Sequence, residues 1–112
     1  MHVLRRSIRD FFLFLIGRRR RFVVAGNSML PTLKNDESIF ISPHHYKDNP
    51  ILEGELVLVK HPNKDLLIVK RVAFIENQSI FLIGDNPKQS TDSRHFGAVS
   101  KDLILGKVCS KL

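Results

Sequence analysis

The sequence is poor in cysteine and has no long hydrophobic run, and each shortage excludes a class of protein. Its single cysteine, Cys109, excludes an internal disulfide framework, suits a reducing compartment, and is expected to be an inert small side chain. The longest apolar stretch, FFLFLIG, has seven residues, whereas a helix needs about 20 to cross a bilayer. The arginine run after it lacks the small-residue cleavage site of a signal peptide. We therefore predict neither a transmembrane segment nor a secretory leader.

Metal-ligand patterns, repeats and linkers are also missing. The five histidines show no metal-ligand spacing, so we expect no metal and no cofactor, and His44 and His45 are predicted to lie in a solvent-exposed loop. We find no internal repeat, no low-complexity tract and no linker long enough to divide the chain. A length of 112 residues suits one domain with a core of modest size.

Positive charge is in excess, but it is concentrated at one end of the chain. The net charge is +7, and residues 1–21 hold seven arginines against a single acid, Asp10. The rest of the chain is nearly neutral, so it lacks the basic surface expected of a nucleic-acid-binding domain. We expect no nucleic-acid partner. A basic module that binds nucleic acid or a membrane surface through this terminus is the non-enzymatic alternative.

Residues 1–21 are predicted to form a basic amphipathic helix. Apolar side chains recur at three- and four-residue spacing, at Leu4, Ile8, Phe11, Phe12 and Leu15. Gly17 is the expected stop. Such a helix packs its apolar face on the domain or rests on a membrane surface. Packing on the domain is the expectation here, and peripheral membrane contact is the alternative.

Residues 22–112 are predicted to form the main domain, built from short strands rich in Ile, Val and Phe. Turn residues separate the strands, which are RFVVAG, ESIFIS, ELVLVK, LLIVKRVAFIE, SIFLIG and LILGKV. Pro, Asn, Asp and Gly gather in the connecting segments. The predicted fold class is mostly β, a small antiparallel pseudo-barrel with an N-terminal α-helix.

Two residues in this pattern point to covalent chemistry. Ser28 lies in GNSMLPTL, where a helix cap is the simpler interpretation. Lys70 lies inside LLIVKRVAFI, where strand alternation places it on an apolar face with Ile68, Val72 and Phe74. The simpler interpretation of Lys70 is an edge-strand side chain whose amine reaches water. A buried lysine has a lowered pKa, however, and can activate a serine without a histidine, so the pair predicts a Ser/Lys dyad.

A third polar segment, GDNPKQSTDSRHFG at residues 84–97, contains groups that suit such a site. Taken alone it is a polar turn. The hydroxyl of Ser90 would orient the Lys70 amine, and Asp92 with Arg94 would form a charge-assisted pair that braces the loop.

With these blocks in this order, residues 22–108 resemble the signal peptidase I superfamily of Ser/Lys proteases. The blocks are GNSMLPTL, GELVLVK, VKRV and GDNPKQSTDSR. The resemblance implies that Ser28 is the nucleophile, that Lys70 is the general base and that Ser90 orients the Lys70 amine. It implies that the backbone N–H of Ser28 stabilises the oxyanion. The residues given supporting roles by this resemblance are Gly84, Asp85, Asp92, Arg94 and Gly26.

The chain is similar in more detail to the nickel-type superoxide dismutase maturation proteases, a short, membrane-free branch. The shared blocks are SMLPTL, LLIVKRV and GDNPxxSTDSRxFG. This similarity implies a cytoplasmic serine endopeptidase whose partner is a nickel superoxide dismutase precursor, from which it removes the N-terminal propeptide. Cleavage of secretory signal peptides is the alternative within the superfamily. The self-cleaving domain of SOS repressors shares the chemistry, but we find neither its cleavage site nor a DNA-binding domain.

Overall fold

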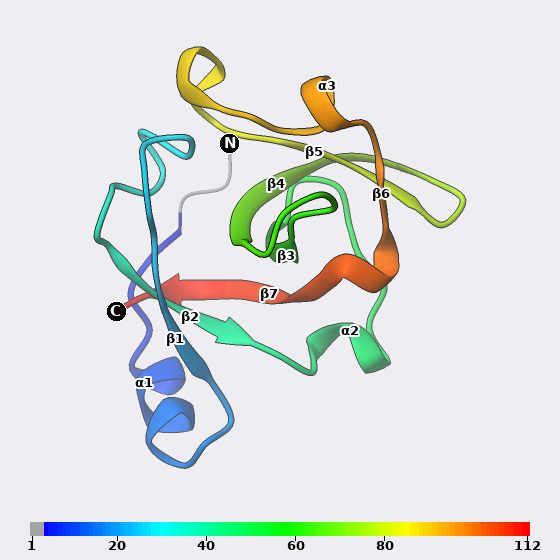
Figure 1. The fold of residues 1–112 in the computed structure, drawn as a ribbon. Helices are drawn as coiled ribbons and strands as arrows, with labels where there is room; N and C mark the ends of the chain where they lie inside the picture. Colours follow the sequence, from blue (N-terminus) through cyan, green and yellow to red (C-terminus); the bar gives the residue numbers. More distant parts are fainter. Residues whose placement is uncertain (1–3) are drawn as a thin grey trace.

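One strongly curled antiparallel sheet organises the chain in the computed structural model, which describes residues 4–112 (Figure 1). Its strand order is β1-β2-β7-β3-β4-β5-β6. The strands are β1 (Arg20–Val23), β2 (Ser38–Ser42), β3 (Leu56–Lys60), β4 (Leu67–Glu76), β5 (Ser79–Ile83), β6 (Val99–Ser100) and β7 (Ile104–Lys111). The helices are α1 (Ile8–Leu15), α2 (His45–Asp48) and α3 (Ser93–Phe96), with 3-10 turns η1 (Pro87–Gln89) and η2 (Lys101–Leu103). The predicted mostly β fold with an N-terminal helix is confirmed, as a half-barrel whose edges are β1 and β6.

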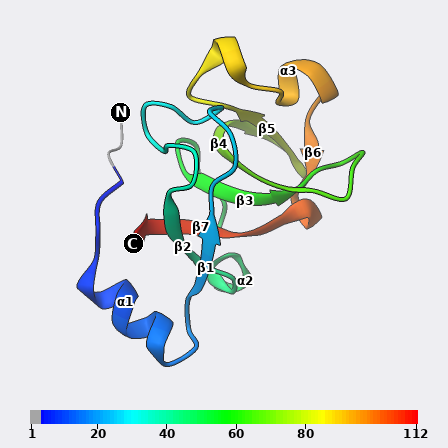
Figure 2. The ribbon, with the colours of Figure 1, turned by 60° about the vertical axis from the view of Figure 1, so that its left-hand side comes forward.

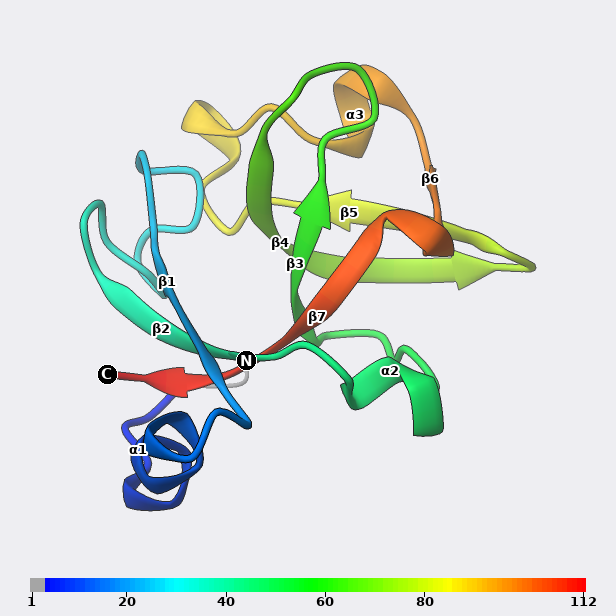
Figure 3. The same ribbon diagram turned by 60° about the horizontal axis from the view of Figure 1, so that its bottom comes forward.

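Apolar side chains pack on both faces of β3, which places this strand in the middle of the fold. Leu56 and Leu58 belong to one buried cluster, and Val57 and Val59 belong to a second. Successive side chains of a strand point to opposite faces, so a strand buried on both sides needs neighbours above and below it. Figure 3 shows β1 and β2 on one side of β3 and β5 and β6 on the other.

The alternation predicted for β4 fails at its C-terminal half. Ile68 and Val72 pack in or against the second cluster, as expected for the face that also carries Lys70. Phe74 does not join them, because a bulge interrupts the pairing with β5 between Val72 and Phe74. One extra residue reverses the side-chain direction. Phe74 is therefore exposed and stacks on Phe81, with ring centroids 4.7 Å apart.

Helix α1 is shorter than predicted and faces the domain with a different side. Leu4 precedes the helix and is buried in the first core cluster, and Gly17, with φ 82°, follows the helix as expected. The residues predicted to face the domain are instead exposed, namely Ile8, Phe11, Phe12 and Leu15. Asp10 is the buried residue of α1, and Figure 2 shows the helix beside β1 and β2. Residues 1–3 of the predicted helix lie outside the described residues, and among residues 4–112 no helix has the length and apolar character needed to cross a membrane.

Candidate active site

Ser28 lies in the segment between β1 and β2, just after the edge strand β1. A buried side chain lies on either side of it along the chain: Val24, four residues before Ser28, is 4% exposed, and Met29, the next residue, is 1% exposed. The segment folds into turns, in which the N–H of Leu33 donates to the carbonyl of Met29 at 2.9 Å. None of the helices described in residues 4–112 begins here, so Ser28 is not a helix cap. The buried neighbours hold a half-buried serine in a defined loop.

Lys70 lies in β4, where it pairs with Val57 of β3 and is only 4% exposed. Its Nζ donates a hydrogen bond to Ser90 Oγ at 3.2 Å. Burial lowers the pKa of Lys70, the negative charge of Asp92 acts against this effect, and the positive charge of Arg94 adds to it. The side chain is therefore not an edge-strand lysine with its amine in water.

The Ser90 hydroxyl connects Lys70 to a fully buried carboxylate. Ser90 Oγ donates to Asp92 Oδ2 at 2.7 Å. The guanidinium of Arg94 donates from Nε to Oδ1 of Asp92 at 2.9 Å and from Nη2 to Oδ2 at 2.6 Å. Burial acts to raise the pKa of Asp92, but the hydrogen bonds from Arg94, Ser90 and the backbone hold that pKa well below its ordinary value. Asp92 is thus a fixed anion next to the Ser90–Lys70 hydrogen bond.

Gly84 allows the loop after β5 to approach the serine segment closely. Its N–H donates to Asp92 Oδ2 at 2.9 Å. A Cβ at this position would overlap Ser90 Oγ and would lie 2.6 Å from the carbonyl oxygen of Ser28. The backbone of Gly84 does not need a positive φ. Close packing therefore requires a glycine at this position.

Asp85 belongs to an ion pair that the sequence did not reveal. Arg71 donates from Nε to Asp85 Oδ1 at 2.8 Å and from Nη2 to Oδ2 at 2.7 Å. Its Nη1 also donates to the carbonyl of Gly54 at 2.7 Å, and the Thr32 hydroxyl donates to Asp85. The pair therefore ties the serine segment, β4 and the loop after β5 together. The available signal was Arg71 itself, a second charged residue beside Lys70 in a mostly apolar strand.

Asn86 is a second residue that sequence reasoning missed. Its N–H donates to the carbonyl of Ser28 at 2.9 Å, and its Nδ2 donates to the carbonyl of Asn27 at 3.0 Å. These two bonds fix the serine segment against the loop that carries Ser90. No spacing rule in the sequence indicates them, because 59 positions separate Asn27 from Asn86.

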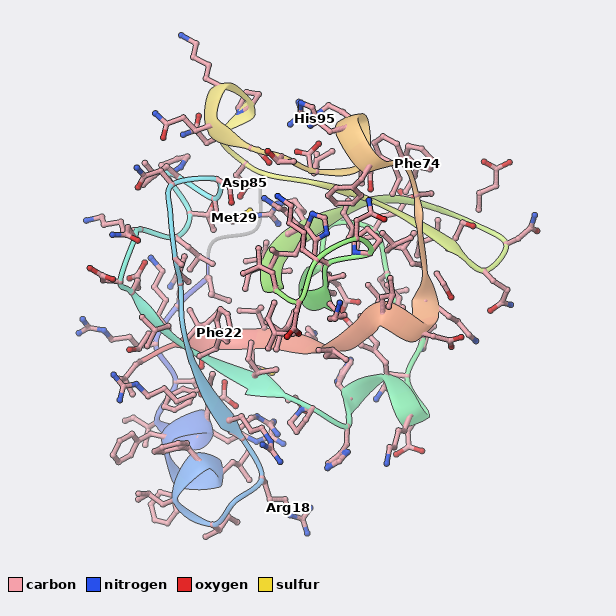
Figure 4. The ribbon with its side chains drawn as sticks, viewed as in Figure 1. Arg18, Phe22, Met29, Phe74, Asp85 and His95 are labelled. Carbon is pink, nitrogen blue, oxygen red and sulfur yellow. The ribbon has the colours of Figure 1, made fainter. Side chains whose placement is uncertain are left out.

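Ser28 and Lys70 line the same cavity, which has a volume of about 120 Å³. The cavity is lined by the end of β1, by the serine segment and by residues 66–70. Its apolar lining residues are Phe22, Val24, Ala25, Met29, Leu66, Leu67, Ile68 and Val69. Figure 4 labels Phe22 on β1, with Met29 and Asp85 above it in this view. The two predicted catalytic residues therefore share a small, mostly apolar pocket.

Two other features of the structure lie apart from these residues. A larger cavity of about 510 Å³ is lined by residues of α2, β4, β5, β7 and their connecting segments, and includes none of the predicted site residues. Within residues 4–112, no three His, Cys, Asp or Glu side chains are grouped as a metal site requires.

Comparison with known proteins places this chain in a family. A family model described as Peptidase S24-like matches residues 20–109. Mitochondrial ATP-independent inner membrane protease subunit 1a of Arabidopsis thaliana is 30% identical, over 90% of this chain and 77% of its own length. Mitochondrial inner membrane protease subunit 1 of Xenopus tropicalis is 26% identical over 80% of this chain, which spans 66% of that relative.

A bacterial relative gives the same result. Signal peptidase I of Bacillus caldolyticus is 26% identical, over 78% of this chain and 75% of its own length. These matches confirm the expected superfamily, and the names of the three relatives say nothing of nickel superoxide dismutase. The chain belongs to the Peptidase S24-like family, within the signal peptidase I superfamily.

Proposed function

We propose that this chain is a serine endopeptidase in which Ser28 attacks the scissile carbonyl and Lys70 takes the Ser28 proton. One observation carries the proposal: a buried lysine with a lowered pKa lines the same cavity as a half-buried serine. A serine hydroxyl is a weak nucleophile until a base removes its proton. A lysine that is desolvated can be that base near neutral pH.

The hydrogen bonds around Ser90 determine where the Lys70 lone pair is available. A hydroxyl has one proton, and Ser90 donates it to Asp92, so Ser90 accepts from Lys70. Asp92 is held as an anion by Arg94, so it does not take a proton from Ser90. A neutral Lys70 then donates one N–H to Ser90 Oγ, and its nitrogen lone pair is free to accept the proton of Ser28.

The proposed reaction proceeds in two transfers. The Ser28 Oγ–carbon bond forms while the hydroxyl proton moves to Lys70, and Lys70 then gives this proton to the leaving amine as the peptide bond breaks. A water then gives a proton to Lys70 as its oxygen bonds to the acyl carbon, and Lys70 returns that proton to Ser28 Oγ as the ester bond breaks, which frees the acid product and restores both residues. The backbone N–H of Ser28 is the proposed oxyanion donor. Gly26 supplies no hydroxyl, and its own N–H is bonded to Asn35 Oδ1 at 2.7 Å.

The edge strand beside the cavity favours a substrate bound in extended form. The end of β1 and residues 66–70 both line the cavity, and β1 is an edge strand of the sheet. An extended peptide can pair its main chain with such an edge while alternate side chains enter pockets. A cavity of about 120 Å³ takes a small apolar side chain.

Substituting Gly84 is expected to separate the catalytic groups without changing any of them. In Gly84→Ala the new methyl group pushes against Ser90 and the Ser28 carbonyl, and a misplacement of about 1 Å lowers kcat about 10²-fold. Turnover of a short peptide substrate measures the effect. Gly17→Ala is the control, because its Cβ meets nothing within 4 Å and the strain of an alanine at its φ of 82° falls far from the site along the chain, so its turnover should stay near the wild-type value. Equal turnover of the two variants would contradict the close-packing role of Gly84.

For the substrate, we propose the precursor of a nickel superoxide dismutase in the cytoplasm, cut once to remove its N-terminal propeptide. Support comes from the sequence blocks SMLPTL, LLIVKRV and GDNPKQSTDSRHFG. The second candidate is a precursor that is exported across a membrane. Support for it comes from relatives named signal peptidase I and inner membrane protease.

The substrate test compares the two precursors side by side. The purified chain and its Ser28→Ala variant are incubated with a nickel superoxide dismutase precursor and with a secretory precursor, and new N-termini are read by mass spectrometry. We expect one cut in the dismutase precursor that requires Ser28, and much slower cleavage of the secretory precursor. Ser28-dependent cleavage of the secretory precursor alone would overturn the dismutase assignment and keep the protease. Cleavage that survives in Ser28→Ala would overturn the assigned nucleophile.

A further inference from the structure

Helix α1 presents an apolar face to solvent. Four of its large side chains are exposed by more than half, namely Ile8 (85%), Phe12 (65%), Leu15 (64%) and the adjoining Ile16 (65%). They recur at positions i, i+4, i+7 and i+8, so they form one continuous stripe. Contiguous apolar surface of this kind on a folded domain marks an interaction site.

Contacts on the other side of α1 fix this orientation. Asp10 is 7% exposed, its Oδ1 accepts from Arg19 Nε at 3.0 Å, and the Ser110 hydroxyl donates to its Oδ2. Phe14 packs on Phe40 of β2, with ring centroids 5.3 Å apart. Rotating the apolar stripe inward would break this ion pair and separate Phe14 from Phe40. The exposed stripe is therefore a stable feature of the folded protein.

The surroundings of the stripe are strongly positive. Six arginines of this segment are exposed, namely Arg5, Arg6, Arg9, Arg18, Arg20 and Arg21. The one acid of the segment, Asp10, is neutralised by Arg19. An apolar cavity of about 200 Å³ extends the stripe past Ile8 and Phe11 to Leu112, with Arg6 and Lys111 at its lining. Exposed apolar side chains in the same segment as exposed arginines complement acyl chains beneath anionic headgroups.

We propose that α1 docks the protein on an anionic lipid surface, with the helix lying in the plane of the membrane. An eight-residue helix is about 12 Å long, far less than the hydrocarbon thickness of about 30 Å, so it lies on the bilayer rather than crossing it. Ile8, Phe12 and Leu15 enter the boundary between headgroups and acyl chains, and the arginines contact the phosphates. The excess of exposed positive charge favours lipid over a second copy of this chain, because two such faces would repel each other. This proposal does not depend on the proposed catalytic residues.

Flotation with vesicles tests the docking. The full chain is mixed with vesicles of phosphatidylcholine containing phosphatidylglycerol, and with vesicles of phosphatidylcholine alone. We expect it to float with the anionic vesicles and to float less as salt is raised. Phe12→Ser and Leu15→Ser should each weaken binding about tenfold, and Arg9→Gln with Arg18→Gln should weaken it about 25-fold, or about fivefold for each arginine.

Matched controls separate docking from general surface effects. Leu52→Ser removes a leucine that is 55% exposed elsewhere on the surface, and Lys47→Gln with Lys88→Gln removes two exposed positive charges outside this face. Both controls should float like the wild type, and circular dichroism should show every variant folded. Failure of the wild type to float, or equal flotation of Leu15→Ser and Leu52→Ser, would overturn the proposal. A dimer on size-exclusion chromatography that Leu15→Ser dissociates, without vesicle binding, would assign the face to a second copy.

Discussion

Replacing Ser28 with alanine, or Lys70 with methionine, is expected to lower peptide cleavage by about 10³-fold or more. Each change removes one partner of a single proton transfer, because Ser28 supplies the proton and Lys70 accepts it in their shared cavity. The double variant should therefore be no worse than either single variant. Initial rates on a peptide substrate, followed by mass spectrometry, measure the loss. Near-normal turnover by Lys70→Met would show that another group is the base.

Thermal unfolding distinguishes loss of chemistry from loss of fold in these variants. Lys70→Met should raise Tm at neutral pH, because burial lowers the pKa of Lys70 and its charge therefore opposes folding. Stability of the wild type should increase as pH rises from the folded pKa to the ordinary value of 10.5, and the advantage of Lys70→Met should shrink over the same interval. Ser28→Ala, at a half-buried position without this charge, should leave Tm near the wild-type value. A large fall in Tm for Lys70→Met would contradict the desolvated amine.

Breaking the ion pair behind the site is expected to have the largest effect on stability. Arg71→Met should lower the free energy of unfolding by about 3–5 kcal/mol, because Asp85 then stays buried without its cation. Burial acts to raise the pKa of Asp85, and hydrogen bonds from Arg71 and Thr32 hold that pKa below its ordinary value. The carbonyl of Gly54 also loses its donor. A domain of this size has about 5–15 kcal/mol in total, so urea unfolding should show a large shift.

Two companion variants make this measurement specific. Lys88→Met removes an exposed positive charge from the same loop and should change stability by less than about 0.5 kcal/mol. Arg71→Met combined with Asp85→Leu should recover part of the loss, because no charge is then left unpaired in the interior. Equal midpoints for Arg71→Met and Lys88→Met would show that the pair adds no stability.

Local patterns predicted the strands well and the helix poorly, for a physical reason. Strand positions follow the density of Ile, Val and Phe, which sheets bury regardless of strand order. The apolar spacing of α1 was genuine, but spacing does not say which surface covers an apolar face. The ion pair of Asp10 with Arg19 and the packing of Phe14 on Phe40 decided which side of α1 faces the domain. Both contacts join α1 to residues outside it. The bulge before Phe74 was likewise set by pairing with β5.

By itself the sequence determined the superfamily, the mostly β fold and the residue types at the candidate site, Ser28, Lys70, Ser90, Asp92 and Arg94. All three follow from local features, because composition, the alternation of apolar residues and the order of the sequence blocks can be read along the chain. Only the tertiary structure decided that Ser28 and Lys70 share a cavity, that Ser90 accepts from Lys70, and that Arg71 holds Asp85. Such contacts join residues 14–42 positions apart, because the curled sheet brings β4, the serine segment and the loop after β5 together. Burial, which lowers the pKa of Lys70, is a property of that packing and not of the lysine or its neighbours in sequence.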